Sequence, residues 1–151
     1  MANTQAMCTS FKGELLVGHH NFGTGVVRAA TTADTLKAAL YLTTATINAS
    51  TTAYTATGEV SGTGYTAGGV TVTNATAPAT SGTTAYWTPS ASISYSSVTL
   101  STAFDCVFIY NSTQSNKAVS VHTFGSQTVT AGTFTLTMPT NDSSTGLIRL
   151  A

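Results

Sequence analysis

Threonine makes up roughly a fifth of this 151-residue chain, whereas Asp, Glu, Lys and Arg together make up only 7%. Soluble domains usually carry about 25% charged residues. Threonine is branched at Cβ, which restricts its first side-chain torsion and suits it to the pleated surface of a sheet. A polar surface built from hydroxyls instead of charges therefore predicts β-structure.

The aromatic content favours a folded chain over a disordered one. Disordered chains lack the aromatic and aliphatic residues that a core requires. This chain has six Tyr, six Phe and one Trp, and 42% of its residues are hydrophobic. A chain of this length forms one domain of ordinary size and buries a core without disulfide or metal cross-links.

The balance of charge excludes some partners and favours others. The formal net charge is zero, and the five basic residues are scattered, so the basic surface that nucleic-acid binding requires is absent. A chain without net charge also has little repulsion between copies. Because monomeric β-proteins usually protect their sheet edges with charges, we expect other copies to cover these edges, although loops and bulges are the alternative.

The beginning of the chain and the cysteines suggest where it is made. Its first residues have neither the basic nor the apolar region of a signal peptide, and no apolar run is long enough to cross a bilayer. We therefore expect synthesis in a reducing cytoplasm and no membrane partner. In that reducing compartment Cys8 and Cys106 are expected to be buried thiols.

Residues 3–18 have the pattern of an amphipathic helix. Met7, Phe11 and Leu15 recur every four residues, and Cys8 and Leu16 widen the apolar stripe. Such a short helix must dock on another surface, either its own domain or a neighbouring subunit. Residues 1–33 are thus predicted to form a helix and linker arm, with six candidate partner-contact residues: Met7, Phe11, Leu15, Leu16, His19 and His20.

Residues 34–151 have the pattern of an all-β domain. Short runs of alternating or continuous apolar residues are separated by Gly, Pro, Asn and Ser, and a change of phase at Ser96-Ser97 predicts a bulge or bend. About eight short antiparallel strands spaced in this way predict a β-sandwich or jelly roll. The expected strands are 35–43, 70–73, 85–87, 93–101, 104–110, 117–124, 127–138 and 147–150.

No residue pattern in the chain predicts catalysis, a cofactor or a metal. No nucleophile elbow occurs, and the five carboxylates do not form a recognisable pair. His19 and His20 lack a third ligand. The glycines at 62, 64 and 68 miss the spacing of a dinucleotide-binding loop by one residue and are not followed by a helical pattern. We therefore expect a protein that is not an enzyme.

Several segments, in the same order along the chain, resemble small structural proteins of tailed-bacteriophage virions, in particular head decoration (cement) proteins. The chain departs from this family at 19–25, so the role of the linker stays open. The segments that carry the resemblance are residues 1–16 (MANTQAMCTSFKGELL), 34–41 (DTLKAALY), 62–69 (GTGYTAGG), 109–113 (IYNST), 116–119 (NKAV) and 147–151 (LIRLA).

The resemblance implies a protein that binds the outside of a phage capsid and bridges neighbouring major capsid proteins. It also implies a homo-oligomer, expected to be a trimer ahead of a dimer, and no catalytic residues. The alternative is a tail, neck or fibre module that attaches to a host surface or to other tail proteins, because small β-folds host both functions. That alternative requires exposed aromatic residues gathered in a groove, with Tyr54, Tyr65, Tyr86 and Trp87 as candidates.

Overall fold

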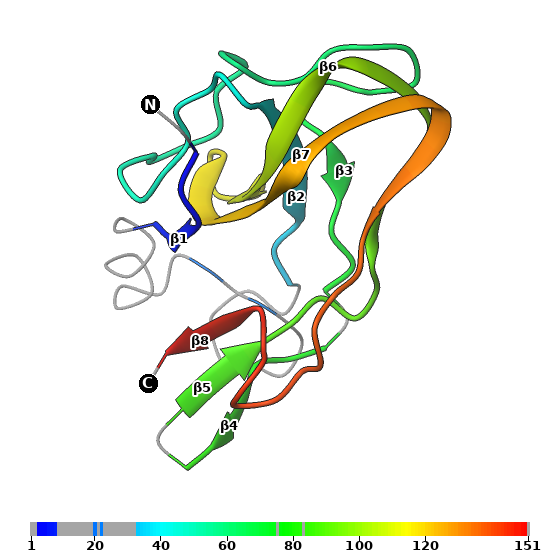
Figure 1. Ribbon diagram of the computed structural model, residues 1–151. Coiled ribbons are helices and arrows are strands. Elements are labelled where there is room, and N and C mark those ends of the chain that lie inside the picture. Colours follow the sequence, from blue (N-terminus) through cyan, green and yellow to red (C-terminus); the bar gives the residue numbers. More distant parts are fainter. Residues whose placement is uncertain are drawn as a thin grey trace.

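The computed structural model shows an all-β protein. It describes residues 3–8, 20, 22, 33–74, 76–82 and 84–150, and these form eight strands in two antiparallel sheets and no helix (Figure 1). The all-β class predicted from the threonine content is therefore confirmed. Within these residues there is also no helix long and apolar enough to cross a membrane.

The larger sheet has five strands in the order β1-β7-β6-β2-β3. Every neighbouring pair is antiparallel, and β6 and β7 form its centre as one very long hairpin. The strands are β1 (Ala6–Met7), β2 (Leu36–Leu42), β3 (Val70–Thr71), β6 (Ile93–Asn111) and β7 (Lys117–Leu136).

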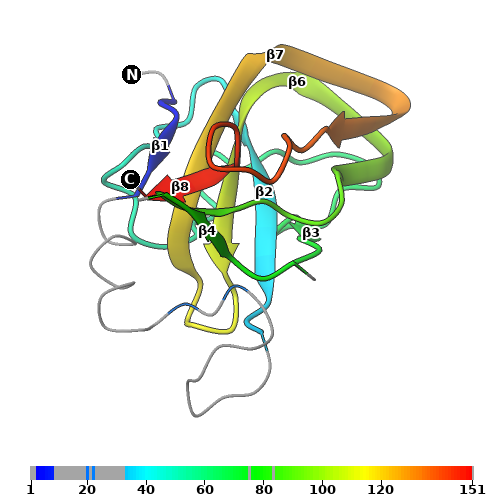
Figure 2. The ribbon, with the colours of Figure 1, turned by 90° about the horizontal axis from the view of Figure 1, so that it is seen from below.

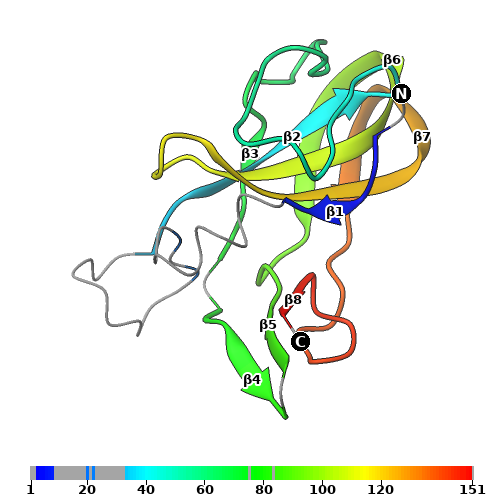
Figure 3. The same ribbon diagram turned by 90° about the vertical axis from the view of Figure 1, so that its left-hand side faces the viewer.

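The smaller sheet has three strands in the order β4-β5-β8, and Figure 3 shows it apart from the larger one. Its strands are β4 (Ala79–Ser81), β5 (Thr84–Trp87) and β8 (Ile148–Leu150). β5 and β8 were predicted, whereas β4 was not. Pro78 and Gly82 bound this short strand, and both residue types are typical of turns.

Four of the expected short strands are joined into two long ones. Residues 93–101 and 104–110 both lie in the 19-residue β6, and residues 117–124 and most of 127–138 lie in the 20-residue β7. The register shifts between Tyr95 and Val98, which confirms the predicted bulge at Ser96-Ser97. Because bulges bend a strand and increase its twist, the two strands form the arched ribbon of Figure 1.

The turn of this long hairpin lies between the expected strands 104–110 and 117–124. Residues 112–116 form turns, and Ser115 and Asn116 adopt the left-handed conformation with φ of 54° and 59°. Asn tolerates this conformation better than most residues because its short side chain bonds to nearby backbone. The pair 104–110 and 117–124 therefore forms a hairpin with a long loop.

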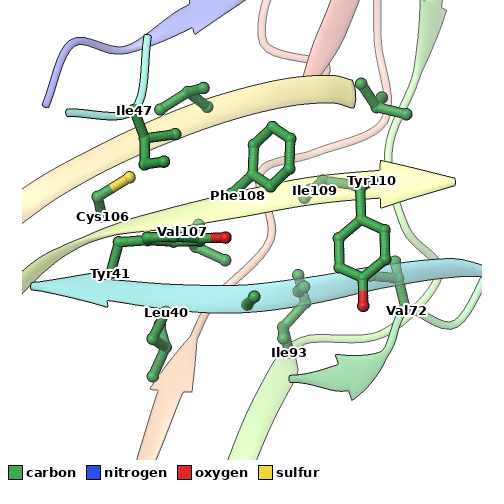
Figure 4. Packing of buried hydrophobic residues seen from close by; sticks show 14 of the residues in the cluster. Leu40, Tyr41, Ile47, Val72, Ile93, Cys106, Val107, Phe108, Ile109 and Tyr110 are labelled. Carbon is green, nitrogen blue, oxygen red and sulfur yellow. The ribbon is translucent and has the colours of Figure 1, made fainter. Parts of the chain in front are cut away.

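The core lies on both faces of the β2–β6 pair. Tyr41 and Phe108 are fully buried and their rings meet edge to face, with centroids 6.1 Å apart (Figure 4). The alternation of Leu36, Ala38 and Leu40 is typical of a half-buried strand, but Ala39 and Tyr41 are equally buried. β2 lies between β3 and β6 in the sheet, and both of its faces carry side chains of the hydrophobic core.

The predicted N-terminal helix does not begin where expected. Residues 3–8 are extended, and Ala6 and Met7 pair with Val121 and Ser120 of β7 (Figure 2). Asn3 fixes this segment, because its side-chain nitrogen donates to Asp105 at 2.7 Å and its oxygen accepts from the Ile47 backbone at 3.0 Å. Residues 9–18 of the predicted helix, and all of the linker 19–33 except residues 20, 22 and 33, lie outside the described residues.

Candidate functional site

Among the described residues, most of the outer edge of β7 is left unpaired. β6 pairs with one side of β7 from Lys117 to Leu136. On the other side, β1 pairs with Ser120 and Val121, Cys8 bonds to Val119, and residues 52–53 bond to Lys117 and Ala118. No other described strand pairs with that outer side. An unpaired strand edge presents a row of backbone donors and acceptors to any strand that approaches it.

This edge has no charged residues to protect it. Between Lys117 and Asp142 the sequence contains no Asp, Glu, Lys or Arg. Natural edge strands are usually blunted by charges, by proline, by bulges or by short length. β7 has bulges next to Thr123 and at Ala131, whereas in its last five residues, Gly132–Leu136, the one register shift has its extra residue in β6.

The end of β7 has two different faces. Thr133, Thr135 and Thr137 are exposed, whereas Phe134, Leu136 and Met138 are partly buried, as the alternation of the sequence predicts. Thr135 shares a hydrogen bond with Ser94 of β6 at 3.1 Å. The edge is therefore lined by hydroxyls on one face and by incompletely covered apolar side chains on the other.

Two hollows adjoin β7 and share His122 and Leu147. The first is apolar, has a volume of about 130 Å³ and is half open. The second is wider, about 540 Å³, and more polar. The first is lined by Ile93, Val107, Ile109, His122, Thr123, Phe124, Leu136, Thr137, Met138 and Leu147, and the second by Gln5, Met7, Thr84, His122, Pro139, Ser143, Thr145, Gly146, Leu147 and Arg149.

His122 lines both hollows and is uncharged. Burial lowers its pKa to about 4 from an ordinary 6.5, because desolvation penalises the charged ring. Its Nε2 lies 2.8 Å from the Ser120 hydroxyl. At neutral pH this side chain therefore adds no charge to the edge.

The six predicted contact residues fall into three groups. Met7 lines the wider hollow beside β7. His20 is only 8% exposed, and its Nδ1 lies 3.1 Å from the Asn111 side chain, which also donates to Asp34 at 2.8 Å. The roles of Met7 and His20 in binding a partner stay predictions. The remaining four candidates lie outside the described residues: Phe11, Leu15, Leu16 and His19.

The four aromatic candidates for a host-binding groove do not gather in one place. Tyr54 and Tyr65 both donate to the Glu59 carboxylate, at 2.6 and 2.7 Å. Trp87 is 2% exposed, and its indole N–H donates to the Thr76 carbonyl at 2.9 Å. Tyr86 lines, together with Trp87, an apolar hollow of only about 90 Å³.

The titratable groups form no metal site in the described part of the chain. No three His, Cys, Asp or Glu side chains converge there. Cys8 and Cys106 are buried thiols, as predicted, and burial followed by the charge of Asp105 raises the pKa of Cys106 to about 12. A thiol with such a pKa is not a nucleophile at neutral pH.

The glycine-rich segment 62–69 is a loop that packs on the rest of the fold. Gly62 and Gly64 pack against the backbone of Thr99 and Ser97 so closely that a Cβ atom would overlap it. Gly68 donates its backbone N–H to Glu59 at 2.8 Å. These glycines therefore serve close packing on β6.

Comparison with known proteins gave no relative, since no family model, curated protein or solved structure matches the chain. The open β7 edge was not predicted from the sequence. The sequence does contain an uncharged stretch between Lys117 and Asp142. That stretch indicates an open edge only once the strand order is known, because the strand order places it at the side of the sheet.

Proposed function

We propose that this chain is a structural virion protein that binds the outside of a phage capsid and bridges neighbouring major capsid proteins. In this proposal the two sheets act as a β-sandwich of the jelly-roll kind, and copies of the chain associate with each other. The resemblance of its sequence segments to phage head decoration proteins supplies the capsid as the partner.

One observation carries the proposal that the chain works in an assembly. Among the described residues, no strand pairs with the outer side of β7 from His122 to Leu136, and this segment has no Asp, Glu, Lys or Arg. Such an edge favours association with another protein surface. A monomeric protein gains nothing from leaving it uncovered, whereas an assembly subunit gains an interface.

The surface chemistry also suits a lattice. Hydroxyl groups lose less on leaving water than ionised groups do, so contacts between threonine-rich surfaces carry a small desolvation penalty. On a capsid each weak contact is repeated many times, and linked contacts reach high total affinity without any one of them being strong. A protein with few charges is therefore suited to covering a repeated surface.

Co-sedimentation with phage heads tests the proposal. Purified protein is mixed with heads that lack it, the heads are pelleted, and bound copies are counted by quantitative mass spectrometry. We expect saturation at roughly tens to hundreds of copies per head, as repeated lattice binding requires, and greater resistance of the heads to heat. Heads that pellet without the protein at saturating concentration contradict the proposal.

The alternative is a tail, neck or fibre module. Its support is the all-β fold, which hosts carbohydrate and host-surface binding in many proteins. The aromatic candidates form two pairs, Tyr54 with Tyr65 at Glu59 and Tyr86 with Trp87 at a small hollow, and do not form one groove. This counts against the alternative, because a sugar-binding groove requires gathered and exposed rings. About six or twelve copies per particle, the numbers typical of symmetric rings, would favour the alternative.

A further inference from the structure

The last part of β7 is the regular section of its open edge. Phe134, Thr135 and Leu136 stand opposite Tyr95, Ser94 and Ile93 of β6, residue for residue. The bulge at Tyr95–Val98 lies opposite Gly132–Phe134, but its one extra residue belongs to β6. In β7 the positive φ of 45° is at Ala131, before this section. Gly132–Leu136 therefore has no extra residue and no left-handed residue of its own to hinder pairing with another strand.

Backbone groups on the outer side of this section have no partner strand among the described residues. In an antiparallel strand, alternate residues direct their N–H and C=O groups to opposite sides. One side of Gly132–Leu136 bonds to β6, so the other side presents its groups outward. β7 contains no proline, and no charged residue lies between Lys117 and Asp142, so neither of these edge-protecting devices is present.

The side chains of this section are complementary to those of a second copy. A two-fold axis perpendicular to the sheet keeps each face of the strand on the same side in both copies. If the axis passes at Phe134, Thr133 of one copy lies opposite Thr135 of the other, and the two Phe134 rings are neighbours. Cross-strand pairs of threonines and of aromatic residues are favourable.

Two further observations favour a second copy as the occupant. The chain has no net charge, so copies do not repel each other. Leu136 and Met138, which continue the apolar face, line the half-open apolar hollow of about 130 Å³, and a neighbouring strand with the same apolar row would cover them. A charged partner strand would instead lose hydration of its charges against hydroxyls.

We propose that Gly132–Leu136 pairs antiparallel with the same segment of a second copy, around a two-fold axis at Phe134. The contact is isologous, so it closes into a dimer and leaves no repeating open edge at this segment. The inference rests on the self-association that is part of the proposed function. It assigns that association to a dimer, not to the trimer expected from the family resemblance.

The test places like charges opposite each other across the proposed axis. In the variant Thr133→Lys/Thr135→Lys, each introduced lysine faces another lysine in the second copy, which is destabilising in a cross-strand pair. Both positions are exposed, so the fold tolerates lysine. We expect the dimer dissociation constant, measured by sedimentation of the purified full chain, to rise roughly tenfold or more.

Two matched variants separate register from general effects of charge. In Thr133→Lys/Thr135→Glu the proposed axis places lysine opposite glutamate in both pairs, so the dimer is expected to persist. Both double variants lose the hydrogen bond between Thr135 and Ser94, so a difference between them does not come from that loss. Thr57→Lys/Thr66→Lys adds the same charge at two exposed threonines outside the strands, and its dimer is expected to be unchanged.

Three results would overturn the inference. The first is a wild-type chain that sediments as a monomer at every concentration, and the second is an unchanged association of the double-lysine variant. The third is equal weakening of the lysine–lysine and lysine–glutamate variants. These measurements contain no capsid, so they test the edge pairing alone. Co-sedimentation with heads tests capsid binding separately, and either proposal can be contradicted without the other.

Discussion

The Glu59 carboxylate accepts a hydrogen bond from the Tyr54 hydroxyl at 2.6 Å, and its other oxygen accepts from Tyr65 at 2.7 Å and from the Gly68 backbone at 2.8 Å. Burial, followed by the hydrogen bond to Glu59, raises the pKa of Tyr54 to about 12 and that of Tyr65 further. One carboxylate thus fixes both tyrosines and the glycine-rich loop that packs on β6.

Replacing Glu59 by glutamine tests this arrangement. The amide nitrogen is a donor, so it leaves at least one of the three donors around it without an acceptor. Because an unsatisfied buried group costs about 1–3 kcal/mol, we expect Glu59→Gln to lower the free energy of unfolding by about that amount in urea titrations. Tyr54→Phe, which removes a single hydrogen bond, is expected to cost only ~1 kcal/mol. Equal stability of Glu59→Gln and wild type contradicts the arrangement.

Two glycine substitutions test the close packing of the loop on β2. Gly69 has φ of 71°, and a Cβ atom there would overlap the Ala38 carbonyl oxygen. We expect Gly69→Ala to destabilise the chain by several kcal/mol, roughly the sum of backbone strain and a forced shift of β2. Gly125→Ala is the matched control, because nothing lies within 4 Å of its Cβ position. Thermal unfolding that shows equal losses for both variants would rule out this explanation.

The position of His122 predicts a loss of stability in acid. Its folded pKa of about 4 lies below the ordinary 6.5, so the folded protein favours the neutral ring. The stabilisation is fully present above pH 6.5 and is lost as the pH falls through 4, by up to ~3 kcal/mol. Urea unfolding at several pH values measures it. His122→Gln is expected to flatten this part of the profile, and an unaltered slope in that variant would assign the effect to other groups.

The bulge in β7 predicts a stabilising substitution. Ala131 has φ of 45°, a conformation that costs a residue with a Cβ atom roughly 1–2 kcal/mol and costs glycine almost nothing. We expect Ala131→Gly to raise the free energy of unfolding by ~1 kcal/mol. Ala91→Gly, at an exposed position without positive φ, is expected to be neutral or slightly destabilising. If both variants lose stability equally, the bulge stores no strain.

The parts of the fold that were predicted correctly are those set by local patterns. The hairpin of residues 104–110 and 117–124 follows from apolar runs on either side of a polar turn. The helix from residue 3 was wrong for Ala6 and Met7, because periodic spacing says nothing about a distant partner such as Val121. The expected strands were separated at Thr102-Ala103 and at Gly125-Ser126, where the structure has register shifts and not strand ends, so the continuity of β6 and β7 was missed.

The candidate site was predictable only in part. Met7 was named from its apolar spacing and does line a hollow beside β7, although it lies on a strand and not on a helix. The open edge from His122 to Leu136 depends on β1 being only two residues long and on β7 lying next to it. Strand order is a long-range property, so the uncharged stretch alone did not reveal it.

A reconstruction of the virion at a resolution that traces this chain tests the central claim most directly. The account predicts density for the chain on the outer capsid surface, at contacts between neighbouring major capsid proteins and repeated over the lattice. Density for the chain found only in the tail, neck or fibres, with a bare outer capsid surface, would contradict it.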